Sequence, residues 1–78
     1  MDFVKILTDI ARAIVDNPDE VTVLESEEGS NVLLELHVAP GDMGKVIGRQ
    51  GRIAKEIRTI VKTVAQRTGE KITVDIVD

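Results

Sequence analysis

The first third of the chain carries apolar residues at intervals of three and four positions, a spacing that places them on one face of a helix. These residues are Phe3, Leu7, Ile10 and Ile14. The expected helix covers residues 3 to 16, with Asp2 as a possible N-cap. Because a proline disfavours the helical conformation of the preceding residue, Pro18 should leave Asn17 outside this helix.

Two strands and a tight turn should follow, over residues 21–28 and 31–39. In the second strand one face is fully apolar, made of Val32, Leu34, Leu36 and Val38. The opposite face is mixed and holds Leu33, Glu35, His37 and Ala39. This alternation is typical of a half-buried strand, so the pair is interpreted as an antiparallel hairpin.

Pro40 and Gly41 end the second strand, and Asp42 is placed to cap a short helix over residues 43–47. A long helix should run from Arg52 until Gly69, which suits a left-handed C-terminal position. Its apolar stripe is formed by Ile53, Ile57, Ile60, Val61 and Val64. The last segment, residues 71–78, alternates as a third strand through Ile72, Val74 and Ile76.

The sequence therefore predicts an α+β fold with the order α-β-β-α-α-β. A chain of 78 residues has room for one hydrophobic core, so residues 1–78 should form a single domain. Parallel pairing of the third strand with the second requires a long crossover, which the two intervening helices supply. The result should be a three-stranded mixed sheet with helices packed on one face.

Composition excludes several classes of function. With no cysteine and one histidine, His37, the chain offers no thiolate metal site, no evident catalytic group and no cofactor site, and His37 is interpreted as structural. Asp2, Asp9 and Asp16 interrupt the apolar pattern of the N-terminus, so neither a signal peptide nor a membrane span is expected there. The cytoplasm is the expected location.

Charge is divided unevenly along the chain, whose net charge is −4. Residues 1–42 hold two basic and ten acidic side chains, a net of −8, whereas residues 43–78 hold eight basic and four acidic ones, a net of +4. Cationic side chains drive binding to phosphates by releasing condensed counterions. The asymmetry therefore favours a basic face for a polyanion.

The segment that best accounts for this face is the GRQG loop, Gly48, Arg49, Gln50 and Gly51, between the two later helices. Glycines permit a tight turn whose backbone can approach a sugar-phosphate chain closely. The amides at the start of the long helix add partial positive charge. Arg49 and Gln50, at the tip, supply a charged and a neutral donor.

Cationic residues flank the loop at Lys45, Arg52 and Lys55, where contact with a sugar-phosphate backbone is expected. Bases would be distinguished in an adjoining groove lined by Ile47, Ile53 and Ala54, with strand residues opposite. The basic residues farther along the helix, Arg58, Lys62 and Arg67, are interpreted as solvated surface.

The segment VIGRQGRIAKEI, residues 46–57, resembles the KH-domain pattern V-I-G-x-x-G-x-x-I-x-x-I. A helix and a strand before the motif are typical of the type II KH fold. In length and layout the chain is similar to the small stand-alone KH proteins of the KhpA (YlqC) family. The resemblance covers nearly the whole chain.

This resemblance implies that the GRQG loop contacts single-stranded RNA, in a domain that accommodates about four nucleotides. It also implies a homodimer, or a heteromer with a larger KH protein of the KhpB (Jag) type. The family's members are RNA chaperones or post-transcriptional regulators connected with cell-envelope growth and cell shape.

An alternative function is a dimerisation or protein-interaction subunit that binds RNA weakly. The apolar stripe of the long helix is wider than a core requires, and its edge at Ile60 could contact a second chain. An enzyme is poorly supported, and so is an RRM, because Phe3 is the only aromatic residue and that fold stacks bases on aromatics.

Overall fold

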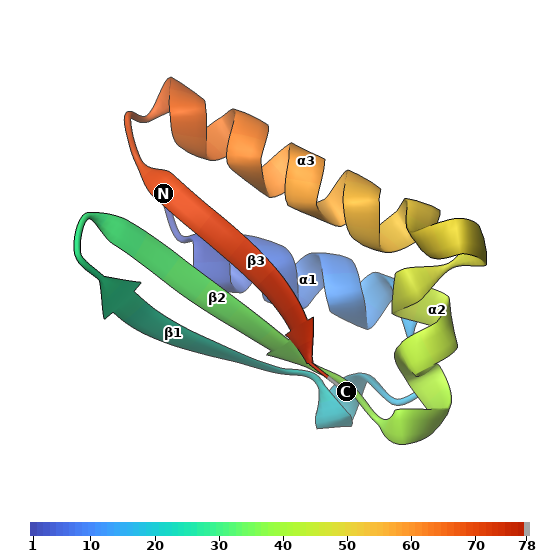
Figure 1. Ribbon diagram of the computed structural model, residues 1–78. Coiled ribbons are helices and arrows are strands. Elements are labelled where there is room, and N and C mark those ends of the chain that lie inside the picture. Colours follow the sequence, from blue (N-terminus) through green and yellow to red (C-terminus); the bar gives the residue numbers. More distant parts are fainter. Residues whose placement is uncertain (78) are drawn as a thin grey trace.

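Three strands form one layer, and the helices lie over one face of it (Figure 1). The computed structural model describes residues 1–77, so Asp78, the last residue of the strand expected over 71–78, lies outside the described residues. The elements are α1 (Phe3–Ile14), β1 (Thr22–Glu28), β2 (Asn31–His37), α2 (Met43–Ile47), α3 (Arg52–Arg67) and β3 (Lys71–Val77). The predicted α+β fold and its element order are confirmed.

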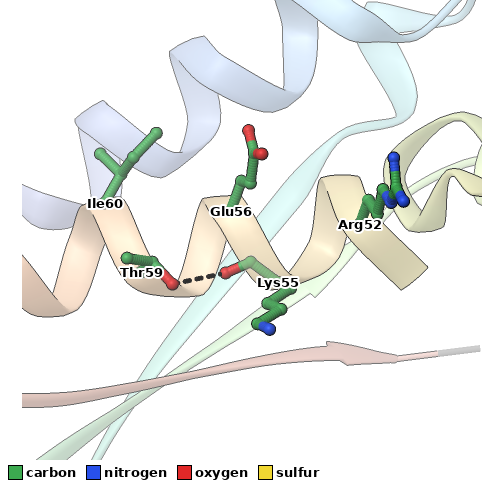
Figure 2. Close-up of a pocket in the computed structure, with 5 residues that line it drawn as sticks. All are labelled: Arg52, Lys55, Glu56, Thr59 and Ile60. Carbon is green, nitrogen blue, oxygen red and sulfur yellow. Dashed lines mark hydrogen bonds between the residues drawn. The ribbon is translucent and has the colours of Figure 1, made fainter. Parts of the chain in front are cut away.

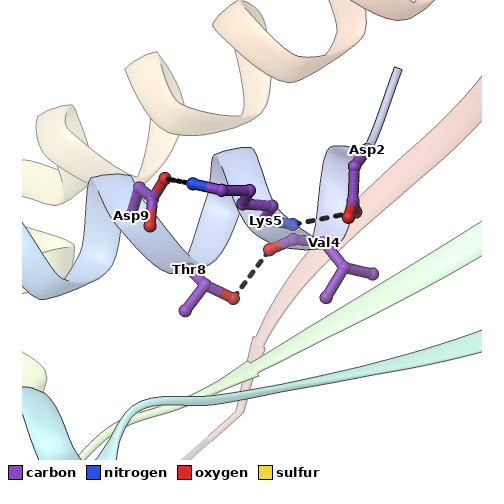
Figure 3. Close-up of polar contacts among 5 residues, drawn as sticks. All are labelled: Asp2, Val4, Lys5, Thr8 and Asp9. Atoms are coloured by element: carbon purple, nitrogen blue, oxygen red, sulfur yellow. Dashed lines mark hydrogen bonds and ion pairs between the residues drawn. The ribbon is translucent and has the colours of Figure 1, made fainter.

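Helix α1 begins as expected. The Asp2 carboxylate accepts a hydrogen bond of 3.0 Å from the Lys5 amide, and the Lys5 ammonium pairs with Asp9 at 2.6 Å (Figure 3). The Thr8 hydroxyl donates to the Val4 carbonyl in the same turns (Figure 3). A side-chain acceptor at the N-cap stabilises a helix by about 1 kcal/mol.

The predicted end of α1 at residue 16 is wrong, because the helix stops at Ile14 and Val15 is already extended, with φ −88° and ψ 161°. Asn17, which precedes Pro18, does lie outside the helix as predicted. The two amides that would have continued the helix, those of Asp16 and Asn17, instead donate to the carboxylate of Asp42. A long-range acceptor thus replaces the helical one.

The sheet has the order β1-β2-β3. Strands β1 and β2 pair antiparallel, with Leu24 opposite Glu35, and β2 and β3 pair parallel, with Leu34 opposite Val74. The hairpin and the mixed sheet are confirmed, although β2 ends at His37, two residues before its expected end. Leu34 and Leu36 are completely buried, and burial of each such side chain contributes about 2 kcal/mol.

The apolar stripe of α3 lies partly elsewhere than predicted. Its buried residues are Ala54, Ile57, Val61 and Ala65. Ile53 and Ile60 remain 37% and 48% exposed, so they do not belong to the core. The buried arc of α3 thus runs through two small residues, Ala54 and Ala65, and leaves Ile53 and Ile60 at its edges. Gly69 follows the helix with φ +75°, as expected.

Among residues 1–77, no helix combines the length and the apolar character that crossing a lipid bilayer requires.

Candidate nucleic-acid interface

The GRQG loop joins α2 to α3 through one short 3-10 turn, Arg49–Gly51. Three of its residues have positive φ: Gly48 at +74°, Gln50 at +54° and Gly51 at +74°. Residues that carry a Cβ atom rarely adopt a positive φ, so the turn requires its two glycines. Gln50 is the one non-glycine residue with positive φ among residues 1–77.

The two glycines are needed for different reasons. A Cβ at Gly48 would lie 2.6 Å from Cγ1 of Ile53, whereas a Cβ at Gly51 would meet no atom within 4 Å. Gly48 is therefore required both by its backbone conformation and by the packing of the first turn of α3. Gly51 is required by its backbone conformation alone. The space that its Cβ would occupy is empty and is open to a ligand.

The N-terminus of α3 lies next to this open space, although its first amide, that of Arg52, donates to the Arg49 carbonyl. Its N-cap is Gly51, which has no side chain to cap the helix. The first N–H groups of a helix lack internal partners and carry partial positive charge. Arg49 and Gln50, both exposed, flank this end of the helix. The geometry suits an anion that approaches the backbone.

Asp42 precedes α2 as predicted, but the interpretation of its side chain as a helix cap is wrong. The carboxylate is 1% exposed and accepts three hydrogen bonds from the end of α1. The amides of Asp16 and Asn17 donate at 3.2 and 3.0 Å, and the Asn17 side-chain Nδ2 donates at 3.0 Å. Asp42 therefore fixes the start of α2, and with it the loop, against the segment that follows α1.

The pKa of Asp42 is below its ordinary value of 3.8. Burial alone would raise the pKa, but the hydrogen bonds from Asn17 and Asp16, together with the charge of Lys45, lower it more. The side chain is therefore a carboxylate at neutral pH, with no proton to interfere with its three donors.

Lys45, expected to contact the RNA backbone, is paired within the chain. Its ammonium lies 3.1 Å from a carboxylate oxygen of Asp16, and this hydrogen bond and charge raise the pKa of Lys45 above 10.5. Both side chains are well exposed, so the pair contributes little stability. Asp16 competes with any phosphate for this cation.

Arg52 and Lys55 lie one turn apart on α3, where they line a shallow depression of about 590 Å³ with Glu56, Thr59 and Ile60 (Figure 2). In Figure 2 the Lys55 side chain extends toward β3, whereas Glu56 and Ile60 point the other way. The structure thus joins two of the expected cationic residues and places Ile60 on the adjacent surface.

The expected apolar groove is only partly present. Ile47 and Ile53 are each 37% exposed and lie beside the loop, but Ala54 is 5% exposed and belongs to the core. Ala54 also departs from the KH pattern, which has isoleucine at this position.

The contact of Arg58 with β3 was not expected from the sequence. Nε of Arg58 donates to the Val74 carbonyl of β3 at 3.3 Å, so Arg58 is not merely solvated. A hydrogen bond to the backbone of a distant strand leaves no trace in local spacing. His37, interpreted as structural, has a buried Nε2 with no hydrogen-bond partner among residues 1–77.

Comparison with known proteins gives a consistent result. The family model described as "KhpA/KhpB, KH domain" matches residues 4–76. The RNA-binding protein KhpA of Clostridium acetobutylicum is 51% identical over 73 residues, which cover 94% of this chain and 97% of the relative. The RNA-binding protein KhpA of Aquifex aeolicus is 43% identical over 68 residues, covering 87% of this chain and 86% of the relative.

Among solved structures, Era of Aquifex aeolicus bound to GDP and aluminium fluoride superimposes with a TM-score of 0.67 at 16% identity. The match covers 94% of this chain and 28% of the Era chain. At this identity the likeness shows a shared fold.

Proposed function

This chain belongs to the KhpA/KhpB KH-domain family, and from that membership we propose that it binds single-stranded RNA through the GRQG loop. The observation that carries the proposal is the open loop itself. Gly51 has open space beside it at the start of α3, which has no side-chain cap, and Arg49 and Gln50 stand exposed next to it. This arrangement suits a sugar-phosphate backbone.

The proposed binding surface comprises the loop and its neighbours: Lys45, Ile47, Gly48, Arg49, Gln50, Gly51, Arg52, Ile53 and Lys55. Cationic side chains supply affinity, and the half-exposed Ile47 and Ile53 supply apolar contact with bases. Lys45 joins this surface when phosphate displaces Asp16. We propose a non-enzymatic, cytoplasmic RNA chaperone or post-transcriptional regulator, one KH domain over residues 1–78.

A titration of ¹⁵N-labelled protein with a short single-stranded RNA tests this proposal directly. The amide resonances of Arg49, Gln50 and Arg52 should shift progressively. A duplex RNA of the same sequence should shift them much less, because its phosphates and bases cannot fit a single-strand groove. If these three resonances stay unchanged while others shift, the loop does not bind RNA.

A second candidate function is dimerisation, favoured by the 48% exposure of Ile60 on a regular helix face. An exposed isoleucine next to the RNA-binding loop would allow two copies to bring two loops together, which raises avidity without new contacts per domain. We propose a homodimer, or a heteromer with a KhpB-type partner, in contact at this face of α3.

Substitution Ile60→Asp should shift sedimentation from dimer to monomer at high micromolar concentration, because a buried unpaired carboxylate is strongly unfavourable at an interface. Leu24→Asp is the matched control, since Leu24 is 52% exposed and pairs with Glu35, on the face of the sheet opposite the buried Leu34 and Leu36. A wild-type chain that stays monomeric alone and with a KhpB-type partner would contradict the dimer.

A further inference from the structure

Strand β1 lies at the edge of the sheet and pairs with β2 on one side only. Six of its seven residues are exposed, all except Val23, so the part of the chain that the structure describes leaves this edge uncovered. An edge strand carries a row of backbone N–H and C=O groups without partners, and a further strand can pair with them. The free edge of β1 is therefore suited to bind an extended polypeptide.

The turn between β1 and β2 fixes how the two strands pair. Gly29 and Ser30 form a two-residue turn, because Glu28 is paired with Asn31 on either side of them. Gly29 has φ +62°, whereas the φ of Ser30 is not positive, as in the type II′ turn that is common in such hairpins. The two residues that flank a turn of this kind exchange backbone hydrogen bonds.

Counting back from this turn shows which backbone groups of β1 are free. Hydrogen-bonded and non-hydrogen-bonded pairs alternate along antiparallel strands, so the backbone groups of Ser26 and Leu24 bond to β2. The residues between them direct their N–H and C=O groups away from the sheet. These residues are Val23, Glu25 and Glu27. The edge thus presents donors and acceptors at every second residue to a partner strand.

This edge of the molecule is also strongly acidic. Residues 13–44 contain eight Asp or Glu residues and no Lys or Arg, a net charge of −8. Among residues 1–77, neither Glu25 nor Glu27 lies within ion-pair distance of a cation. Five of the ten basic residues lie on α3, which covers β3 at the opposite edge of the sheet (Figure 1). The β1 edge should therefore repel phosphates and attract cations.

The side chains of β1 indicate what a partner strand should carry. Glu25 and Glu27 lie on the same face of the sheet as the buried Leu34, since Glu25 is paired with Leu34. Leu24 lies on the other face and is 52% exposed. Opposite charges on directly paired strand residues are favourable, and like charges are unfavourable. A partner strand should therefore have Lys or Arg opposite the two glutamates and an apolar residue opposite Leu24.

A second copy of this chain does not fit the edge. Pairing of β1 with β1 of another copy would place Glu25, Glu27 and Glu28 of both chains beside one another, which is unfavourable. The other free edge, that of β3, carries one lysine and one aspartate, Lys71 and Asp75, and so offers no excess of cations. The acidic side chains thus act against self-association through β1 and favour a strand of opposite charge.

We propose that the free edge of β1 is a docking site for an extended, cationic segment of another protein, which adds to the three-stranded sheet as a further strand. Main-chain hydrogen bonds with residues 23, 25 and 27 supply affinity, and Glu25 and Glu27 select Lys or Arg. This site goes beyond the proposed function. It lies at the other edge of the sheet from α3, so it leaves the GRQG loop free for RNA.

A titration of the ¹⁵N-labelled full chain with a synthetic peptide tests this proposal. The peptide has seven residues, as β1 has, with capped ends and with lysine alternating with valine or threonine. The amide resonances of Val23, Glu25 and Glu27 should shift, and exchange of these amides with deuterium should slow, because each gains a hydrogen bond. The amides of Arg49 and Gln50 should not respond.

Two altered peptides separate the effect of charge from that of strand pairing. A peptide with glutamate in place of every lysine should not bind, because it places like charges opposite Glu25 and Glu27. A peptide with N-methylated lysine amides keeps every charge but loses the donors that face β1. It should bind more than about tenfold more weakly than the parent peptide, since several hydrogen bonds are lost.

Variants of the chain test the same two effects from the other side. E25Q/E27Q should bind the lysine peptide about fivefold more weakly, because two pairs of opposite charge are lost. The matched control, E56Q/E70Q, removes the same charge from two exposed positions outside the sheet and should bind as the wild type does. E25P removes the outward N–H of residue 25, which an edge strand tolerates, and should bind more weakly than E25Q.

The proposal is wrong if the lysine peptide leaves the amides of residues 23–27 unchanged. It is also wrong if E25Q/E27Q binds this peptide as the control does, or if the N-methylated peptide binds as tightly as its parent. Shifts of the same amides that grow with the concentration of the chain itself would assign the edge to a second copy and would equally contradict the proposal. None of these results affects the RNA-binding proposal, which depends on residues 48–52.

Discussion

Replacing Arg49 and Gln50 together by aspartate will lower the affinity for single-stranded RNA by roughly a hundredfold and leave the fold intact. The variant exchanges one cation for an anion and adds a second anion where the phosphates should lie. Loss of a charge-assisted hydrogen bond costs about 1.5–3 kcal/mol, and 2.7 kcal/mol corresponds to a hundredfold. Filter binding at moderate salt measures the affinity.

The fold should tolerate this variant because both side chains are exposed. Gln50 has φ +54°, and aspartate is among the residues that tolerate this left-handed conformation best. The melting temperature should therefore change by no more than a few degrees. A large loss of stability would show that the loop supports the fold rather than a ligand.

The control R12D/S30D makes the same change in charge at two exposed positions outside the loop. It should lower affinity only slightly, through the overall field. Equal affinities of the loop variant, the control and the wild type would rule out RNA binding by the loop.

Asp42→Ala should lower the melting temperature by more than about 10 °C, since it leaves the two amides and the Nδ2 group that donate to Asp42 without their acceptor. Asp42→Asn keeps the volume and one acceptor, so it should fall between the alanine variant and the wild type. Circular dichroism at neutral pH measures all three.

The same carboxylate gives stability a defined dependence on pH. Its pKa is lowered on folding below the ordinary 3.8, so its contribution is present above that value and is lost as the pH falls through the folded pKa. The difference in melting temperature between the wild type and Asp42→Ala should therefore persist from pH 7 to about pH 4 and shrink below it.

Asp19→Ala is the control for these measurements, because Asp19 is exposed near the same segment. Its melting temperature should stay within about 3 °C of the wild type. If the Asp42→Ala variant melts as the wild type does, the three hydrogen bonds contribute nothing measurable and the account of the α1–α2 connection is wrong.

Local patterns predicted the elements well because each pattern is decided by neighbours in sequence. The alternation through Leu34 and Leu36 and the spacing through Ile57 and Val61 follow directly from the periods of a strand and a helix. The position of α2 was also predictable, since Pro40 and the loop glycines bound it. These features gave the fold and located the candidate loop.

Contacts across the fold were not predictable in this way. Asp42 precedes a helix, which locally favours a cap, but its partners lie 25 and 26 residues earlier in the chain. Arg58 likewise finds its acceptor 16 residues later, on a strand. In both cases the hydrogen-bond partner lies far away in sequence, and the spacing of residues along the chain does not indicate which residue it is.

Whether a residue at the edge of the apolar stripe is buried depends on how α3 is rotated about its axis. A helical wheel does not fix this rotation, so the burial of Ile53, Ile60 and Ala54 could not be predicted. In the structure the buried arc runs through Ala54 and Ala65, two small residues that carry little weight in a count of large apolar side chains. The width of the apolar stripe did indicate that some of its members lie outside the core.

Because Ile53 packs against Gly48, the GRQG loop should not form the same turn when it is transferred to another protein without Ile53. A graft of these four residues between two other helices omits Ile53, whose Cγ1 lies 2.6 Å from the position that a Cβ of residue 48 would take. Over evolutionary time the two positions should be coupled, so that a larger residue at one is accompanied by a smaller residue at the other.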